Sequence, residues 1–476
     1  MGHRTGRGSG AEGTTPELTR RTQPFRDYRT ALGLGGGTVV MAASQEPPAP
    51  AYTSAYLRYA LGLLCLVYTV NYLDRQILAI LLQSIKKELR LTDAQLGLLS
   101  GTAFGLFYAT LGIPIARLAD RYSRRVVMAV CLALWSLMTS LCGTAGSFAL
   151  LLACRIGVGV GEAGGSPPAH SMISDYFPPE RRATALAVFA LGVPLGMLIG
   201  YSVGGWIDEV VGWRHAFFAA GAPGLVLSLV VALTLREPAR GHSEGLTPTE
   251  AAAPRTAEVL HFLRRARSFR HVALGAALNG FAAYSVVTWM PAFLIRSHGM
   301  GTAEAGAWLA FLIGVVGAAG NYLGGVLGDR WARTDVRSRV WLPGIAIASG
   351  FPLFFITYTT SERWIALLAF ALAMFLGMAC QAPLFAAAQF LAPPRMRATA
   401  AAVLLFAVNI VGLGAGPAVT GALSDAQAPR YGDASLARAL LVVSSVLVWA
   451  GFHFFLAGRT FEADLARARE AADGRT

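Results

Sequence analysis

The chain has 476 residues, of which 54% are hydrophobic and only 14% are charged. Soluble domains carry about 25% charged residues, so this composition indicates a membrane protein, for which lipid is the solvent. The net charge of +13 does not indicate a nucleic-acid-binding protein, because the arginines lie in short loops between apolar segments and form no continuous stripe.

Residues 1–54 are polar and rich in Gly, Pro, Thr and Arg, a composition typical of a disordered tail. No apolar segment precedes Ala55, so the sequence shows no signal peptide. Met1 and Met41 are both available as translation starts, and the sequence does not decide between them.

Twelve apolar stretches follow, each near the length of about 20 residues that a bilayer-spanning helix needs. They cover 55–82, 94–116, 125–144, 148–173, 182–205 and 214–235, and then 270–295, 304–328, 340–359, 364–390, 398–423 and 438–458. We therefore predict an all-α membrane protein with twelve transmembrane helices in two pseudo-symmetric six-helix halves. The expected parts are a cytoplasmic tail at 1–54, a bundle at 55–235, a cytoplasmic linker at 236–269, a second bundle at 270–458 and a cytoplasmic tail at 459–476.

Lysine and arginine are distributed unequally between the loops on the two sides. Loops on the side of the N-terminus, the linker included, carry nineteen of these residues, and loops on the opposite side carry eight. Because cytoplasmic loops are enriched in positive charge, we expect both termini to lie in the cytoplasm.

A short loop occurs twice, at residues 116–125 and 325–333, each time after an apolar, glycine-spaced helix. Repeated hydrophobic halves are typical of secondary transporters. An aspartate at this position can bind an arginine or a helix N-terminus. We therefore predict a cytoplasmic gate formed by Asp120, Arg124, Asp329 and Arg330. The alternative is that the arginines only set the topology.

Glycine recurs every four residues in several predicted helices, which lets backbones approach closely in lipid. The glycines are Gly97, Gly101 and Gly105 in the second helix, Gly192, Gly196, Gly200 and Gly204 in the fifth, Gly320, Gly324 and Gly328 in the eighth, and Gly412 and Gly416 in the eleventh. From the repeat, we expect the second helix to pack against the eleventh and the fifth against the eighth, between the halves. Such ridges are equally consistent with static dense packing and with a smooth contact along which the two halves move relative to each other.

Only four charged side chains fall deep inside the predicted helices, namely Asp74, Arg75, Arg155 and Glu162. Charge inside a membrane is costly, so these residues are functional candidates. Asp74 and Arg155 lie at similar depth and are expected to pair, and Glu162 lies two turns, roughly 10 Å, beyond Arg155. A carboxylate that loses its arginine to an anionic substrate gains proton affinity. The sequence thus predicts proton coupling through Asp74 and Glu162, and the alternative is a static ion-pair cluster.

Several other functions lack a sequence signature. The G-x-G-x-x-G run at residues 159–164 has no preceding strand and lies inside a predicted membrane helix, so it does not indicate a dinucleotide site. No phosphate-binding loop and no catalytic constellation occurs, and all five cysteines fall in apolar segments. We therefore expect neither an enzyme nor a cofactor, disulfide or metal site.

Over about residues 55–458 the chain resembles the major facilitator superfamily. The resemblance rests on the loop at Asp120, on Arg155 and on the run at 192–196. Ala116 and Ser123 depart from it, because the family's loop usually has glycine there. A narrower resemblance, to bacterial spinster-type transporters, rests on residues 71–75, 155–163, 174–178 and 181–182.

The spinster-type family moves lysophospholipids and sphingosine-1-phosphate-like lipids, and some members are proton-coupled. The resemblance therefore implies a secondary transporter of an amphipathic lipid in a bacterial inner membrane, with the major facilitator fold and alternating access. It assigns Asp74, Arg75, Arg155 and Glu162 to the family's functional positions, and Arg155 suits an anionic head group. We expect Arg75, Arg155 and Glu162 to contact the substrate.

The apolar second half is the expected place for a lipid tail. Its candidate lining residues are Phe281, Tyr284, Trp289 and Phe385, each of which could instead face lipid or pack internally. Two alternatives stay open: a proton-coupled transporter of a drug, sugar or organic anion, and a receptor or scaffold with the shape of a transporter. The expected partners are the small molecule, protons and membrane lipid, with no nucleic acid and a monomeric chain.

Overall fold

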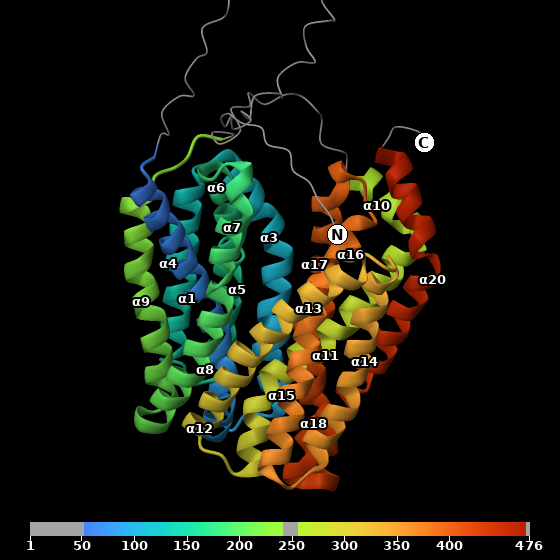
Figure 1. Ribbon diagram of the computed structural model, residues 1–476. Coiled ribbons are helices and arrows are strands. Elements are labelled where there is room, and N and C mark those ends of the chain that lie inside the picture. Colours follow the sequence, from blue (N-terminus) through green and yellow to red (C-terminus); the bar gives the residue numbers. More distant parts are fainter. Residues whose placement is uncertain (1–51, 241–255, 473–476) are drawn as a thin grey trace, which may run out of the picture. The chain divides into compact units, whose positions relative to one another are not determined.

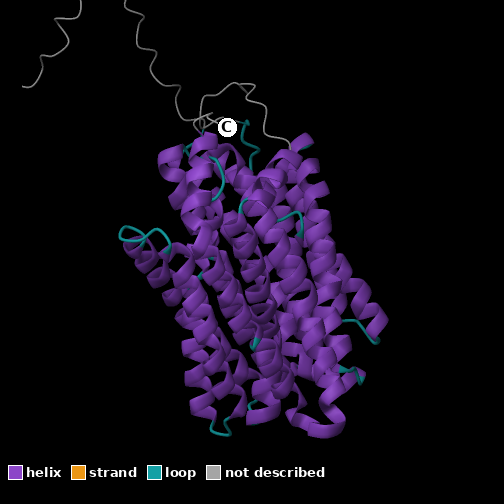
Figure 2. Ribbon diagram, turned by 90° about the vertical axis from the view of Figure 1, so that its right-hand side faces the viewer, coloured by secondary structure: helices purple, strands orange, loops and turns teal. Residues whose placement is uncertain are grey.

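Long helices joined by short loops make up the part of the chain that the computed structural model describes, residues 52–240 and 256–472. These residues contain no strand, as Figure 2 shows, and the predicted all-α fold class is confirmed. Most of the predicted N-terminal tail, the alternative start at Met41 and the middle of the predicted linker lie outside the described residues.

The first half runs from α1 to α9 (Figure 1). Its elements are α1 (Ser54–Leu89), α2 (Asp93–Gly97), the π-helical η1 (Leu98–Thr102), α3 (Ala103–Arg121), α4 (Arg124–Cys142), α5 (Phe148–Glu162), α6 (Ser166–Tyr176), α7 (Pro179–Ala190), α8 (Gly192–Val211) and α9 (Trp213–Thr234). Elements α2 to α3, α5 to α6 and α7 to α8 each form one candidate crossing, so this half contains six.

The second half follows the linker. Its elements are α10 (Thr256–Arg265), α11 (Arg267–His298), α12 (Thr302–Leu309), η3 (Ala310–Val316), α13 (Gly317–Trp331), α14 (Ser338–Thr359), α15 (Arg363–Ala379), α16 (Gln381–Phe390), η4 (Pro394–Met396), α17 (Arg397–Val408), η5 (Asn409–Ala415), α18 (Gly416–Tyr431), η6 (Gly432–Ala434), α19 (Ser435–Ser444) and α20 (Val446–Ala472). We call the side where α1 begins and α20 ends the terminal side, and the opposite side the far side.

Eleven helical segments in the described ranges are long and apolar enough to cross a membrane. The last of them, Pro394–Ala472, has 79 residues. A straight helix of that length would measure about 120 Å, several times the thickness of a bilayer. The segment contains two predicted stretches, 398–423 and 438–458, and the chain turns between them at Gly432, whose φ is +54°. Twelve crossings therefore account for the eleven segments.

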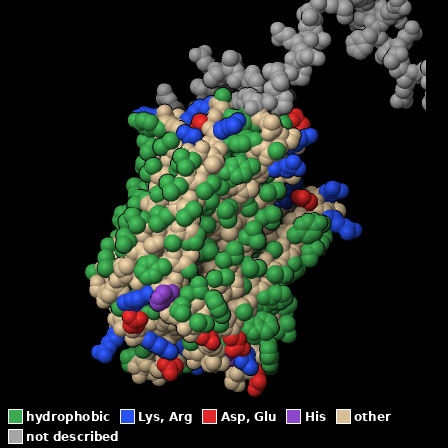
Figure 3. Space-filling model, turned by 90° about the vertical axis from the view of Figure 1, so that its left-hand side faces the viewer, with side chains coloured by type: hydrophobic (Ala, Val, Ile, Leu, Met, Phe, Trp, Pro, Cys, Tyr) green, Lys and Arg blue, Asp and Glu red, His purple; other side chains and the backbone are tan. Residues whose placement is uncertain are grey.

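Hydrophobic side chains cover the face of the molecule that Figure 3 presents, and charged side chains gather mainly at its two ends. Large apolar residues such as Trp206, Leu233 and Trp364 are at least 60% exposed. In water such a surface would be unfavourable, but it suits contact with lipid tails.

Both predicted seams between the halves are present. On the second and eleventh helices, a Cβ atom added at Gly97 would lie 2.4 Å from the carbonyl oxygen of Pro417. On the fifth and eighth helices, a Cβ at Gly306 would lie 2.2 Å from the carbonyl oxygen of Tyr201. These backbones are therefore in direct contact, and no side chain fits between them.

The glycine ridges of the fifth and eighth helices do not form their seam, so that part of the prediction is wrong. The ridge of the fifth helix packs within the first half, where Gly196 lies against Thr69 of α1. The ridge of the eighth helix packs within the second half, where Gly324 lies against Ala379 of α15. A long glycine ridge packs best against a helix that runs alongside its whole length. For both ridges that neighbouring helix belongs to the same half.

Three π-helical segments, η1, η3 and η5, interrupt helices that meet between the halves. The hydroxyl of Thr102, at the end of η1, donates to the carbonyl oxygen of Gly414 in η5 at 2.7 Å. A π-turn leaves backbone groups outside the regular helical pattern and is often found at functional sites. This hydrogen bond therefore joins the two halves at irregular points of both helices.

Candidate functional site

The four deep charges meet at the centre of the first half. Helix α1 carries Asp74 and Arg75, and α5 carries Arg155 and Glu162. Asp74 is 0% exposed, Glu162 is 1% exposed and Arg155 is 2% exposed. Charged groups this deeply buried require specific partners, because desolvation otherwise makes them very costly.

The ion pair at this centre joins Arg75 to Glu162, with 2.6 Å between Nε and Oε2. Asp74 instead accepts a hydrogen bond from the Thr139 hydroxyl of α4 at 3.0 Å. The predicted pairing of Asp74 with Arg155 is therefore wrong. Consecutive residues on a helix point about 100° apart, so Asp74 faces α4 while Arg75 faces α5. Similar depth in the membrane did not determine which side chains meet.

Aromatic rings surround the two guanidinium groups. The Arg75 guanidinium carbon lies 4.9 Å from the Tyr72 ring centre, 5.1 Å from that of Phe104 and 4.6 Å from that of Tyr108. Arg155 lies 5.2 Å from the same Phe104 ring. Each contact is within the range of a cation–π interaction, which strengthens when water is excluded. Sequence reasoning missed Phe104 and Tyr108, although their i, i+4 spacing puts both on one helix face.

Several polar atoms of this cluster have no hydrogen-bond partner among the described residues. They are Oδ1 of Asp74, Oε1 of Glu162, and Nε and Nη1 of Arg155. Buried polar atoms are nearly always hydrogen-bonded in folded proteins. Within the described residues, Arg155 therefore has unpaired donor atoms, and each of the two carboxylates has one unpaired oxygen.

The four predicted aromatic residues of the second half lie in different surroundings. Tyr284 packs against the core of the first half, and its hydroxyl lies 3.5 Å from Oδ1 of Asn409. Trp289 is 0% exposed, and its Nε1 donates to the carbonyl oxygen of Pro417 at 2.9 Å. Phe281 and Phe385 are half-buried. The structure thus packs Tyr284 against the first half and uses Trp289 for packing between α11 and α18.

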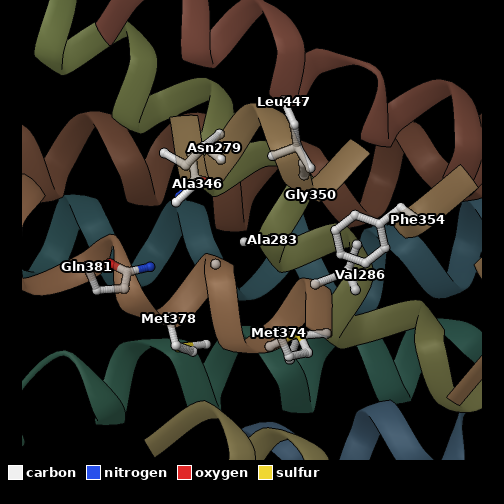
Figure 4. Close-up of a pocket in the computed structure, with 15 residues that line it drawn as sticks. Asn279, Ala283, Val286, Ala346, Gly350, Phe354, Met374, Met378, Gln381 and Leu447 are labelled. Atoms are coloured by element: carbon white, nitrogen blue, oxygen red, sulfur yellow. The ribbon is translucent and has the colours of Figure 1, made fainter. Parts of the chain in front are cut away.

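A largely apolar pocket lies in the second half, between α11, α14, α15, α16 and α20 (Figure 4). Its lining includes Ala283, Val286, Ala346, Phe354, Met374 and Met378. Asn279 and Gln381 are its polar lining residues. None of the four predicted aromatic residues lines it. Small residues on facing helices are the sequence signal that could have indicated this cavity. This cavity suits a flexible apolar group.

Arg124 anchors the start of the linker on the terminal side. It is 1% exposed, forms an ion pair with Asp175, and places Nε 2.7 Å from the Glu237 carboxylate. Glu237 also accepts from the backbone N–H of Arg125 and the Ser123 hydroxyl, so it caps the N-terminus of α4. Burial alone would raise the pKa of Glu237, but these donors outweigh it and hold the pKa below its usual value.

The other predicted gate residues are exposed on the terminal side. Asp120 lies 3.7 Å from Arg240, and the two side chains are 73% and 50% exposed. Asp329 and Arg330 are exposed and form no ion pair within the described ranges. The contacts of Arg124 and Asp120 stay within the first half and the start of the linker, so the gate itself stays a prediction.

Comparison with known proteins gives a consistent result. Residues 64–417 match the Major Facilitator Superfamily. An MFS-type efflux pump of Mycolicibacterium smegmatis is 36% identical over 407 residues, which cover 85% of this chain and 94% of that protein. The spinster protein of Drosophila melanogaster is 30% identical over 381 residues, and the match covers 77% of this chain and 62% of that protein.

Among solved structures, the fold is similar to a bacterial homolog of the human lysosomal transporter spinster. In its inward-facing and unoccupied conformation that protein gives a TM-score of 0.80 at 32% identity, with 87% of this chain and 99% of that chain covered. In its inward-facing and occupied conformation the TM-score is 0.76 at 31% identity, with the same shares covered.

Proposed function

Because this chain belongs to the Major Facilitator Superfamily and is a transporter of the spinster type, we propose that it moves an amphipathic lipid with an anionic head group. The proposed substrate class is a lysophospholipid or a lipid similar to sphingosine 1-phosphate. Transport would proceed by alternating access between the two halves, 55–235 and 270–458, in a monomer.

One observation carries the proposal: a buried, partly unpaired cationic site in one half is combined with a largely apolar cavity in the other. Arg155 has two free N–H-bearing atoms for a phosphate or carboxylate. The apolar lining of the cavity suits part of an acyl chain. Tyr284 would lie between the two regions, since it packs from α11 against the core of the first half. A small hydrophilic substrate would not need this division.

Proton coupling would use the carboxylates of the charged cluster. Glu162 is paired with Arg75 at 2.6 Å, and the partner of Asp74 among the described residues is the Thr139 hydroxyl. An anion at Arg155 would change the charge that both carboxylates experience, and their proton affinity would change with it. Substrate and proton binding would thereby be linked.

The proposed orientation has the terminal side in the cytoplasm of a bacterial inner membrane. The excess of Lys and Arg in loops on that side supports it. In this orientation Arg124 and Glu237 lie at the cytoplasmic surface. The predicted gate would form there when Asp120, Arg124, Asp329 and Arg330 are brought closer in the opposite conformation.

A second candidate is efflux of a drug-like compound. It is favoured by the relative from Mycolicibacterium smegmatis, whose name is MFS-type efflux pump and which matches 85% of this chain. An apolar cavity also suits many drugs, so the two candidates differ mainly in whether the anionic head group is required.

Transport by purified protein in proteoliposomes tests the proposal. With an imposed pH gradient, we expect uptake of a radiolabelled C18 lysophosphatidic acid that collapses when the gradient is dissipated. Arg155→Ala should abolish uptake, and Glu162→Gln should retain exchange but lose accumulation against the gradient. Arg459→Ala, which removes an exposed arginine of α20, is the matched control and should transport normally.

Two outcomes would contradict the proposal, one for the site and one for the substrate. Near-normal lipid accumulation by both the Arg155→Ala and Glu162→Gln variants would overturn the assignment of the site. Uptake of a cationic dye with no binding of the lysolipid would favour drug efflux instead.

A further inference from the structure

A second buried charge cluster lies on the far side, where residues of both halves converge on Asp93. This residue begins α2 and is 2% exposed. Arg296 of α11 contacts both carboxylate oxygens, with Nη1 2.7 Å from Oδ2 and Nη2 2.7 Å from Oδ1. Lys86 of α1 and Ser424 of α18 also donate to the carboxylate. We call these four residues the Asp93 cluster.

Residues of each half bind residues of the other half at this cluster. The carboxylate of Asp425, on α18 of the second half, accepts from the backbone N–H of Asp93 at 3.0 Å and from that of Ala94 at 2.7 Å. Arg296 also donates from Nε to Gln83 of α1 at 2.8 Å. All three nitrogens of the Arg296 guanidinium therefore bind residues of the opposite half, and its side chain is only 9% exposed.

Close backbone packing fixes this geometry. A Cβ atom at Gly421 of α18 would lie 2.1 Å from the carbonyl oxygen of Asp93. The Trp289 ring lies against the same glycine and is held by its hydrogen bond to Pro417. Because α2 and α18 touch here without intervening side chains, a small separation of the halves on this side would break several of these bonds together.

Other polar contacts between the halves extend from the middle of the membrane to the far side. Thr102 bonds to Gly414, Tyr201 donates to the carbonyl oxygen of Val287, and Glu209 accepts from the backbone N–H of Ala303. By contrast, the far-side ion pair of Glu88 with Arg214 lies within the first half and is 52% and 31% exposed. The Asp93 cluster is distinguished by combining burial, full charge and attachment to both halves.

We propose that Asp93 and Arg296 are positioning residues for transport, which hold the far side closed and must separate in every cycle. Access from the far side requires α2 to leave α18, and that movement removes Asp93 from Arg296 and Ser424. Each group then needs water in place of its partner, so the cluster sets the balance between the two conformations. This role depends on the chain being an alternating-access transporter and not on which substrate it carries.

Distances between spin labels, measured by double electron–electron resonance, test the proposal without substrate. Spin labels at Ser147→Cys and Ser361→Cys report across the far side, because both residues are exposed in far-side loops of opposite halves. The five native cysteines are replaced by alanine in this background. In Asp93→Asn, Lys86 and Arg296 face each other without a carboxylate, so the ratio of open to closed far side should rise about tenfold or more.

Glu88→Gln is the matched control, since it breaks an ion pair on the same side within one half, and it should leave the distance distribution unchanged. Asp93→Glu should restore most of the closed population, which loss of folding could not explain. If Asp93→Asn does not fold, Ser424→Ala provides a milder break with a smaller shift in the same direction. An unchanged distribution in a folded Asp93→Asn or Arg296→Gln variant would overturn the proposal, whatever the transport assays give.

Discussion

The two halves of this transporter have the same helical plan but differ in what they bury. The first half buries four charged side chains in its centre and Arg124 near its terminal end. The second half encloses a cavity whose only polar lining residues are Asn279 and Gln381. Its terminal-side ion pairs within the described residues are Arg337 with Glu462, which are 40% and 54% exposed, and Arg467 with Asp464, which are 45% and 3% exposed. A repeat fixes the backbone plan, whereas the chemistry inside each copy is free to differ.

The difference between the halves matches the two unlike ends of the proposed substrate. A charged group in lipid needs partners at fixed positions, and the first half provides them through α1, α3, α4 and α5. An acyl chain needs only space and apolar contact, which the small residues of the second half leave open. Substitutions in the first half should therefore change recognition of the charged head group. Substitutions in the second half should change how affinity depends on the length of the acyl chain.

The largest expected effect follows from removing Arg75. The Arg75→Ala variant leaves Glu162 buried without its ion-pair partner, and breaking a buried pair costs about 3–5 kcal/mol. We expect transport per folded protein to fall at least about a hundredfold, which corresponds to less than that cost. The measurement is lysolipid uptake by monodisperse protein in liposomes.

Arg75→Lys sharpens this test, because lysine keeps the charge but cannot present a planar group to Tyr72, Phe104 and Tyr108. It should fall between the wild type and Arg75→Ala. Equal activity of all three proteins would mean that the charged centre is only structural.

A smaller and more selective effect should follow from filling the cavity. Ala346→Phe reduces the space for a chain, and each methylene that loses its contact costs about 0.8 kcal/mol. Loss of two methylenes would weaken binding of a C18 lysolipid about tenfold, while a C10 lysolipid should bind as before. The measurement is a set of dissociation constants against chain length.

Ile345→Phe is the control for the cavity variant. Ile345 precedes Ala346 on α14 and is 66% exposed, so its change faces outward. If Ala346→Phe weakened binding of short and long lysolipids equally, the cavity would not hold the acyl chain. The same conclusion would follow if Ile345→Phe weakened binding as much as Ala346→Phe.

The smallest effect concerns stability on the terminal side. Glu237→Gln removes a carboxylate that caps α4 and binds Arg124, so the free energy of unfolding should fall by about 1 kcal/mol and the melting temperature by about 2–4 °C. Since the folded pKa of Glu237 lies below its usual value, its contribution is complete above that usual value. It disappears as the pH falls through the lowered pKa.

The corresponding change in the second half is Glu462→Gln. Because Glu462 is 54% exposed, its ion pair is screened by water, and we expect no measurable change in melting temperature. Thermal unfolding in detergent between about pH 7 and pH 3 compares the two variants. A larger loss in Glu462→Gln than in Glu237→Gln would contradict the contrast between buried and exposed pairs.

Sequence patterns predicted the crossings well because the cost of polar groups in lipid acts on each stretch separately. The same cost made Asp74, Arg75, Arg155 and Glu162 recognisable, since deep charges are rare. Their pairing was not predictable from depth, because the rotation of α1 decides that Asp74 meets Thr139 and Arg75 meets Glu162.

Features that depend on several helices at once were missed. The cavity in the second half arises where five helices leave space, and no single stretch of sequence records that. The glycine ridges were recognised, but four-residue spacing does not specify the partner helix, as the contact of Gly196 with α1 shows. Asp93 and Arg296 lie at the ends of predicted stretches, where a charge is ordinary and draws no attention in a sequence.

The ring of Phe104 serves both Arg75 and Arg155, at 5.1 Å and 5.2 Å from its centre. A neutral hydrocarbon surface therefore connects the cation beside the proton-accepting carboxylate with the cation that is free to take an anion. In the proposed cycle, Arg155 would turn toward the substrate and leave Phe104, and a tilt of this ring would then change how firmly Arg75 is held. Reorientation of one benzene ring would be enough to link the two events.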